Sequence, residues 1–190
     1  TSEGVEPYLR SVYRGEPPAE TVAEFRRRFD LIGRSPLIEI TRGQGAGLQQ
    51  LLDDDAPGEY LVEVGMLHTA PSIRDALATL LPRVERVIAI VLAPHYSPFI
   101  MGGYGTALAA AATELGATIP VTIADPWYEI PGWIDSLSER LAHTIAEAGS
   151  LPVVFTAHSM PEVVVKRDPG YIDQIHETIR LVAARTGLRD

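Results

Sequence analysis

The sequence predicts an α/β fold with an open, mostly parallel sheet and helices on both faces. Residues 87–92 are apolar throughout, as in a strand that is covered on both sides. From residue 60 onward, short apolar runs alternate with segments of helical periodicity. This alternation is typical of right-handed crossovers between parallel strands. A chain of 190 residues with one such pattern is predicted to form a single domain, residues 1–190.

The first third of the chain is predicted to be helical. Apolar residues recur at helical spacing over residues 3–13 and again over residues 19–31. Ser35 and Pro36 are a typical N-cap and first helical residue, and they open a third helix that runs to about Leu52. Three glycines weaken this third helix.

Strands and helices alternate in the rest of the chain. The expected strands are 60–66, 84–93, 119–124 and 153–156, and the expected helices are 72–81, 104–115, 132–148 and 170–185. Doubly wound folds begin on a central strand, and no strand precedes the first helix of this sequence. We therefore expect that the first strand of the fold is missing.

The composition excludes several classes of protein. The formal charge is −9, from 16 basic and 25 acidic residues, and no basic stripe could neutralise nucleic-acid phosphates. There is no cysteine, which excludes disulfides and cysteine-ligated metal sites. No apolar run approaches the roughly 20 residues of a membrane span. We expect no nucleic-acid partner, no stable membrane insertion and a cytoplasmic location.

Polar and aromatic residues follow the expected strands. They are His68, His95, Tyr96, Asp125, Trp127, Tyr128 and His158. Parallel strands end at one edge of a sheet, where ligands of open α/β sheets bind. Rings beside histidines predict a cleft for a flat ligand, and the three histidines could also hold a metal, although no tight ligand spacing supports it. His158 has two interpretations. It is a functional residue that transfers protons or binds a metal, or it is an ordinary loop histidine.

Five segments of the chain carry a resemblance to a known family: residues 32–37, 64–68, 92–97, 156–161 and 167–171. Together they resemble the ferrochelatases, enzymes that insert ferrous iron into a porphyrin during haem synthesis. The motif Thr156–Pro161, with Arg167–Tyr171 after it, is similar to the histidine signature of that family. Residues 32–37, 64–68 and 92–97 resemble three further family segments in the same order. The resemblance covers essentially the whole chain. It is strongest to the bacterial soluble type, which metallates coproporphyrin III.

The resemblance implies a chelatase-like fold in which this chain is the N-terminal one of two similar domains, with the second domain absent. It implies that His158 is the catalytic residue, which accepts a pyrrole proton or hands over the metal. Fe²⁺ would be a substrate, so no cofactor is required, and the full-length protein is expected to be a monomer. The family's glutamate that faces this histidine has no counterpart in the 190 residues, so the chain alone is expected to be inactive.

The resemblance also implies a set of porphyrin-binding residues: Val12, Tyr13, Arg14, Arg28, Ser35, His68 and Tyr104. Arg28, Ser35 and Tyr104 match residues that bind propionates. Residues 12–14 match the part of the first helix that packs over the macrocycle, and His68 matches a pocket histidine. Two alternatives remain open at this point: a single-domain enzyme similar to the cobalt-inserting chelatases, and a porphyrin-binding module without catalysis.

Overall fold

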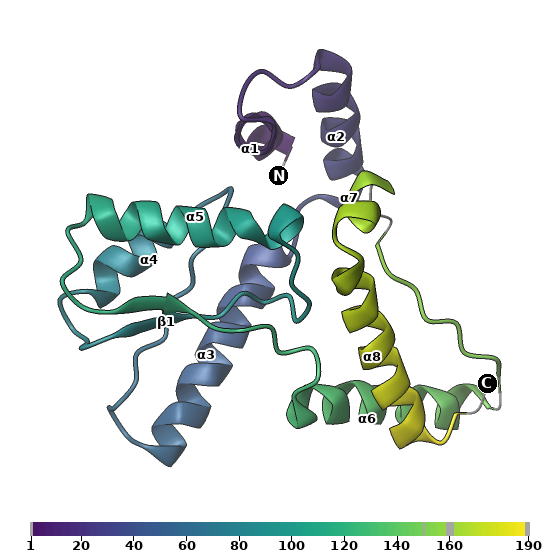
Figure 1. The fold of residues 1–190 in the computed structure, drawn as a ribbon. Coiled ribbons are helices and arrows are strands. Elements are labelled where there is room, and N and C mark those ends of the chain that lie inside the picture. The colour runs from purple at the N-terminus through teal and green to yellow at the C-terminus, as the bar shows by residue number, and fades with distance from the viewer. Residues whose placement is uncertain (1, 150, 159–161, 189–190) are drawn as a thin grey trace. The chain divides into compact units, whose positions relative to one another are not determined.

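The structure is a computed structural model that describes residues 2–149, 151–158 and 162–188 (Figure 1). It divides into two compact units, one of Thr1–Val87 with Thr106–Val121 and the other of Ile88–Gly105 with Thr122–Asp190. The chain passes between the units within two strands, β1 (Val87–Ala89) and β2 (Val121–Ile123), and within helix α5 (Pro98–Glu114). Each unit is described below by itself.

The two strands form a parallel pair. The Val87 amide donates to the Pro120 carbonyl at 2.9 Å, and the Ala124 amide donates to the Ala89 carbonyl at 2.8 Å. The residue numbers of the two strands rise together along the ladder, as parallel pairing requires. The α/β class with an open parallel sheet is thus confirmed, in a shorter form than expected, because the strand expected over 84–93 pairs only over Val87–Ala89.

Two of the expected strands are wrong. Residues 60–66 contain no strand beyond one bridge between Met66 and Ser72. The side chain of Gln49 bonds to two groups of this backbone instead: it donates to the Tyr60 carbonyl at 3.0 Å and accepts from the Val62 amide at 2.8 Å. A strand exists only where a neighbouring strand pairs with its backbone, and a side-chain amide has taken that place here.

The strand expected over 153–156 is also absent, so His158 does not follow a strand. Residues 151–158 form no regular element, and Val154 is 80% exposed. Apolar residues predict a strand only when a sheet has an edge to receive it, and no described strand pairs with this segment.

The first unit begins with helices that match the sequence prediction closely. A short 3₁₀ turn, Ser2–Gly4, leads into α1 (Val5–Tyr13), and α2 (Ala19–Ile32), α3 (Leu37–Asp55) and α4 (Ile73–Leu80) follow. A buried cluster joins α1 to α2, with Val5, Leu9 and Val22 at its centre and Phe25 and Phe29 against it. These are the apolar positions whose helical spacing predicted the two helices.

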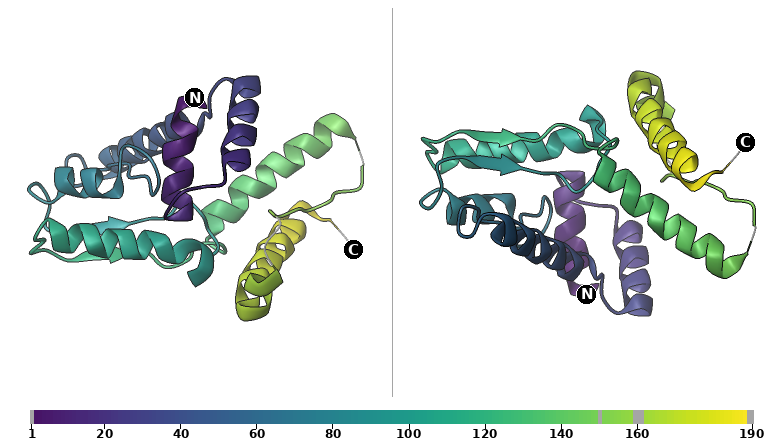
Figure 2. Two further views of the ribbon diagram at one scale, coloured as in Figure 1. Left: turned by 90° about the horizontal axis from the view of Figure 1, so that it is seen from above. Right: turned by 90° about the horizontal axis from the view of Figure 1, so that it is seen from below.

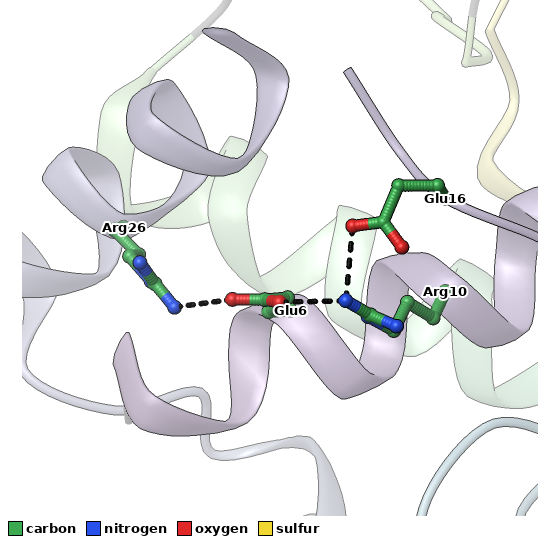
Figure 3. A network of polar contacts seen from close by, with 4 residues as sticks. All are labelled: Glu6, Arg10, Glu16 and Arg26. Atoms are coloured by element: carbon green, nitrogen blue, oxygen red, sulfur yellow. Dashed lines mark hydrogen bonds and ion pairs between the residues drawn. The ribbon is translucent and has the colours of Figure 1, made fainter. Parts of the chain in front are cut away.

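A polar network also joins α1 to α2 (Figure 3). Glu6 accepts from Arg10 at 3.1 Å and from Arg26 at 2.7 Å, and Arg10 also donates to Glu16 at 2.9 Å. Glu6 therefore lies between two guanidinium groups, one on its own helix and one on the next. The network therefore links α1 and α2 on their exposed sides, while the apolar cluster joins them on their buried sides.

Helix α3 contains glycines, and one of them is needed for packing. A Cβ at Gly45 would lie 2.7 Å from Cγ2 of Val64, whereas a Cβ at Gly43 or Gly47 would meet open space. Gly65 is also needed for packing, because a Cβ there would lie 2.8 Å from the backbone Cα of Ile73 at the start of α4, and a backbone atom cannot move aside as a side chain can. The extended segment around residue 64 thus packs closely on both α3 and α4.

The second unit is built on two long helices, α6 (Pro131–Ala148) and α8 (Pro169–Thr186), which pack against each other (Figure 2). Ile134 of α6 and Val182 of α8 are almost fully buried. A short helix that the sequence did not predict, α7 (Glu162–Arg167), precedes α8. Among the described residues, no helix combines the length and the apolar character needed to cross a membrane.

Candidate functional site

The eight site residues that the family resemblance assigns are divided between the two units. Tyr104 and His158 belong to the second unit and the other six to the first. The two groups are described separately, beginning with the first unit. The last three residues of the motif Thr156–Pro161 lie outside the described residues.

Val12, Tyr13 and Arg14 lie at the end of α1, and all three are exposed. Arg14 is the C-cap of the helix and adopts the left-handed conformation, with φ of 52°. This conformation is unfavourable for a residue with a side chain and is found mostly at helix ends and functional sites. The end of α1 therefore presents two large side chains and a cation to solvent.

His68 lies beside α1, although 57 residues separate it from its partner there. Its Nδ1 is 3.0 Å from the Ser11 hydroxyl, and the Tyr8 ring meets its ring edge-on at 5.9 Å between centroids. The structure thus brings His68 close to the helix that carries residues 12–14. Ser11 carries no signal in the sequence, because only the tertiary contact gives it a role.

Arg28 and Glu24 are joined on α2. Arg28 Nε donates to Glu24 Oε1 at 2.7 Å, and Arg27 forms two further bonds to the same carboxylate, at 2.8 and 2.9 Å. These bonds to Arg27 and Arg28 lower the pKa of Glu24 to about 2. The Arg28 guanidinium carbon also lies 5.7 Å from the centroid of the Phe25 ring. Among the described residues only Nε of Arg28 has a hydrogen-bond partner, so its two Nη groups are left to bind a carboxylate.

Ser35 caps the backbone less directly than expected. Its hydroxyl accepts from the Leu37 amide at 3.3 Å, but helix α3 begins at Leu37 and Pro36 is the N-cap residue. The helix begins one residue later than expected, which is within the usual variation of assigned helix ends. Ser35 is exposed beside Arg34, which pairs with Glu39 at 2.7 Å.

In the second unit, the segments that follow β1 and β2 come together, as expected for neighbouring parallel strands. The Trp127 amide donates to the Pro94 carbonyl at 3.0 Å, and Trp127 Nε1 donates to the Val91 carbonyl at 2.9 Å. The rings of His95 and Tyr128 stack at 5.9 Å between centroids, with 21° between their planes. The predicted rim is thus present in part: His95, Trp127 and Tyr128 come together after these two strands, whereas His68 and His158 do not follow strands.

His95 is half-buried, and helix α8 covers it. Its Nε2 lies 2.9 Å from the Thr178 hydroxyl, and the Tyr171 ring meets it edge-on at 6.2 Å. Burial lowers the pKa of His95 below its ordinary value, because a charged ring would lose solvation. The sequence placed His95 on the rim, but it did not reveal Thr178 as its partner.

Tyr104 is half-buried on α5, and His158 is exposed in the irregular segment before α7. Among the described residues, no three His, Cys, Asp or Glu side chains are close enough to hold a metal ion together. The two remaining histidines, His143 and His176, are exposed on α6 and α8.

Comparison with known proteins identifies the class to which this fold and these residues belong. The family model described as Ferrochelatase matches residues 5–190. The chain therefore belongs to the ferrochelatase family.

Three relatives show the extent of the similarity. The chain is 37% identical over 173 residues to a ferrochelatase of Geobacter sp. (strain M21), an alignment that covers 89% of this chain and 53% of the relative. It is 35% identical over 192 residues to a ferrochelatase of Deinococcus radiodurans, covering 96% and 60%. It is 33% identical over 189 residues to a coproporphyrin III ferrochelatase of Listeria innocua, covering 95% and 61%. The chain thus spans between about half and two thirds of the length of these relatives.

Proposed function

We propose that this chain forms the histidine-bearing part of a ferrochelatase that inserts Fe²⁺ into coproporphyrin III. The observation that carries this proposal is the family match over residues 5–190, which contains His158 and all the expected porphyrin-binding residues. Several relatives that are named coproporphyrin III ferrochelatases support this choice of porphyrin. The reaction is the formation of nitrogen–metal bonds, which makes the enzyme a lyase.

The proposed role of His158 follows from the chemistry of the reaction. A porphyrin loses two pyrrole N–H protons when a divalent metal enters, so a base is needed close to the ring centre. A neutral imidazole can accept a proton near neutral pH and is also a competent ligand for ferrous iron. The exposure of the His158 side chain to solvent supports both proposed roles.

The proposed recognition of the porphyrin uses six residues of the first unit and Tyr104 of the second unit. Coproporphyrin carries carboxylates, and the two Nη groups of Arg28 can bind one of them through two hydrogen bonds. The Ser35 hydroxyl and the Tyr104 phenol are proposed to donate to other carboxylates. Val12 and Tyr13, exposed at the end of α1, offer apolar surface to the macrocycle, with Arg14 and His68 beside them.

The test is an anaerobic titration of the 190-residue chain with coproporphyrin III, followed by addition of ferrous iron. We expect a shift of the porphyrin absorbance on binding but little conversion to haem, because the family's facing glutamate is not among these residues. A divided site loses the alignment of its groups, which can contribute several kcal/mol to a rate. Absence of any absorbance shift at high micromolar protein would contradict the proposed porphyrin site.

The role of His158 is tested with a matched pair of variants. His158→Ala is expected to abolish whatever metallation the chain shows, and to change the spectrum of added iron or zinc porphyrin complexes. His143→Ala removes an exposed histidine of α6 whose one described ion-pair contact is with Glu147, and it should leave both readouts unchanged. Equal effects of the two substitutions would argue against a specific role for His158.

A further inference from the structure

Thr178 lies where three segments of the second unit meet. It is 7% exposed, on α8, and its hydroxyl contacts groups in the segments that follow β1 and β2. Oγ1 lies 2.9 Å from Nε2 of His95 and 3.0 Å from the carbonyl oxygen of Tyr128. A single buried hydroxyl therefore bridges two segments that are separated by the length of helix α5 and strand β2.

The donors and acceptors at this hydroxyl allow one arrangement. A carbonyl oxygen only accepts, so the single hydroxyl hydrogen of Thr178 points to the Tyr128 carbonyl. The oxygen must then accept from His95, which requires a hydrogen on Nε2. Because burial lowers the pKa of His95, the ring is neutral at slightly alkaline pH and carries this one hydrogen. Nδ1 therefore keeps its lone pair, and it has no hydrogen-bond partner within the described residues.

A second contact from the same helix strengthens the connection. Gln174, one turn before Thr178, accepts from the Tyr96 amide at 2.8 Å and donates to the Tyr96 carbonyl at 3.0 Å. The two residues are four apart and so lie on one face of α8. Through these two residues, that face of α8 bonds to the backbone of Tyr96 and to the ring of His95, both in the segment after β1.

We propose that Thr178 is a positioning residue that fixes His95 as the Nε2–H tautomer and couples the segments that follow β1 and β2. His95 then presents an acceptor nitrogen, which suits a cation or a hydrogen-bond donor and disfavours a carboxylate. The consequence for porphyrin affinity rests on the proposed function, whereas the tautomer and the coupling of the two segments do not.

The tautomer is tested by NMR on the 190-residue chain at pH 7.5, from the ring ¹⁵N and ¹³Cδ2 shifts of His95. The wild type is expected to show the Nε2–H form. Thr178→Val keeps the shape of the side chain but removes the hydroxyl, and it should move the ring to the other tautomer or to a mixture. Thr178→Ser keeps the hydroxyl and should restore the wild-type shifts.

Thr186→Val is the matched control on the same helix, because the Thr186 hydroxyl donates within its own helix, to the Val182 carbonyl at 2.9 Å. It should leave the His95 shifts unchanged. The proposal is overturned if the wild type has hydrogen on Nδ1, or if Thr178→Val keeps the wild-type shifts. These results do not depend on any ligand.

The coupling of the segments is measured by hydrogen exchange at the Tyr96 and Trp127 amides, which bond to Gln174 and to Pro94. Thr178→Val should speed exchange at both by about tenfold, the effect of losing one hydrogen bond of typical strength. Unchanged exchange would refute the coupling. If the wild type also binds coproporphyrin III, its affinity should fall in Thr178→Val and not in Thr186→Val. A wild type that does not bind refutes the proposed porphyrin site of this chain, while the NMR and exchange results still decide the role of Thr178.

Discussion

The hydroxyl of Ser11 lies 3.0 Å from Nδ1 of His68. This contact joins the last turn of α1 to the segment that precedes α4, and both belong to the first unit. The three residues that follow Ser11 are those that the family resemblance assigns to the porphyrin pocket. The contact therefore sets where His68 stands relative to the exposed end of α1.

Removal of the Ser11 hydroxyl is expected to release His68. Ser11→Ala should lower the free energy of unfolding by about 1 kcal/mol, the typical value of one hydrogen bond, as measured by urea denaturation. It should also broaden or shift the His68 ring resonances. Ser136→Ala is the control, because Ser136 is exposed on α6 and its side chain bonds to no described residue. Identical behaviour of the two variants would mean that the Ser11–His68 contact does not form in solution.

The contribution of the polar network around Glu6 to stability is predicted to depend on the salt concentration. Glu6→Gln should lower the free energy of unfolding by about 0.5–1 kcal/mol at low salt, because the network is exposed but contains two cations on one carboxylate. The loss should shrink in high salt, where charges are screened. Glu3→Gln is the control, because Glu3 is exposed and pairs with no described cation. A loss that is independent of salt would show that the network contributes through packing alone.

Glu24 makes a prediction about acid stability. Its pKa falls from 4.5 to about 2 in the folded protein, because Arg27 and Arg28 bond to it. The unfolded chain therefore takes up the proton first as the pH falls. The stabilisation is fully present above pH 4.5 and is lost as the pH falls toward 2.

Glu24→Gln should accordingly be less stable than the wild type at neutral pH and should lose less stability on acidification. Urea denaturation across this pH range measures the difference. Asp30→Asn, on the same helix and without a described ion pair, should keep the wild-type acid dependence. A Glu24 carboxyl that titrates in the ordinary range by NMR would contradict the prediction.

Substitution by alanine is predicted to have opposite effects on stability at Gly65 and at Gly47. Gly65→Ala should destabilise the protein by about 1–3 kcal/mol, because the new Cβ would meet the backbone of Ile73, which cannot move as a side chain can. Gly47→Ala, in helix α3 and with open space around it, should stabilise by about 0.5–1 kcal/mol. Thermal or urea denaturation of both variants checks the pair. A tolerated Gly65→Ala would show that the close approach of this segment to α4 is not real.

The helices of this protein were predictable because their signals are local. The apolar spacing over residues 3–13 and 19–31 predicted α1 and α2, and Ser72 marks the start of α4, where it forms a capping box with Asp75. Every one of these signals acts within one or two turns of the residue that carries it. The short helix α7 is the exception, since six residues hold too little periodicity to be recognised.

The strands were less predictable because pairing is not local. Residues 60–66 and 153–156 have strand-like composition, yet Gln49 bonds to the backbone of the first, and no described strand pairs with the second. Composition shows that a segment can be a strand. It does not show whether another segment is there to bond with it.

The sequence by itself determined the family, the positions of the long helices and the set of candidate residues, because motifs and periodicity are written in neighbouring residues. Only the tertiary structure decided which side chains meet: Ser11 with His68, Glu6 with Arg26, and Thr178 with His95. These partners lie 20 to 83 residues apart in the chain. Contacts over such separations form only when packing brings helices and loops together, so no local pattern in the sequence predicts them.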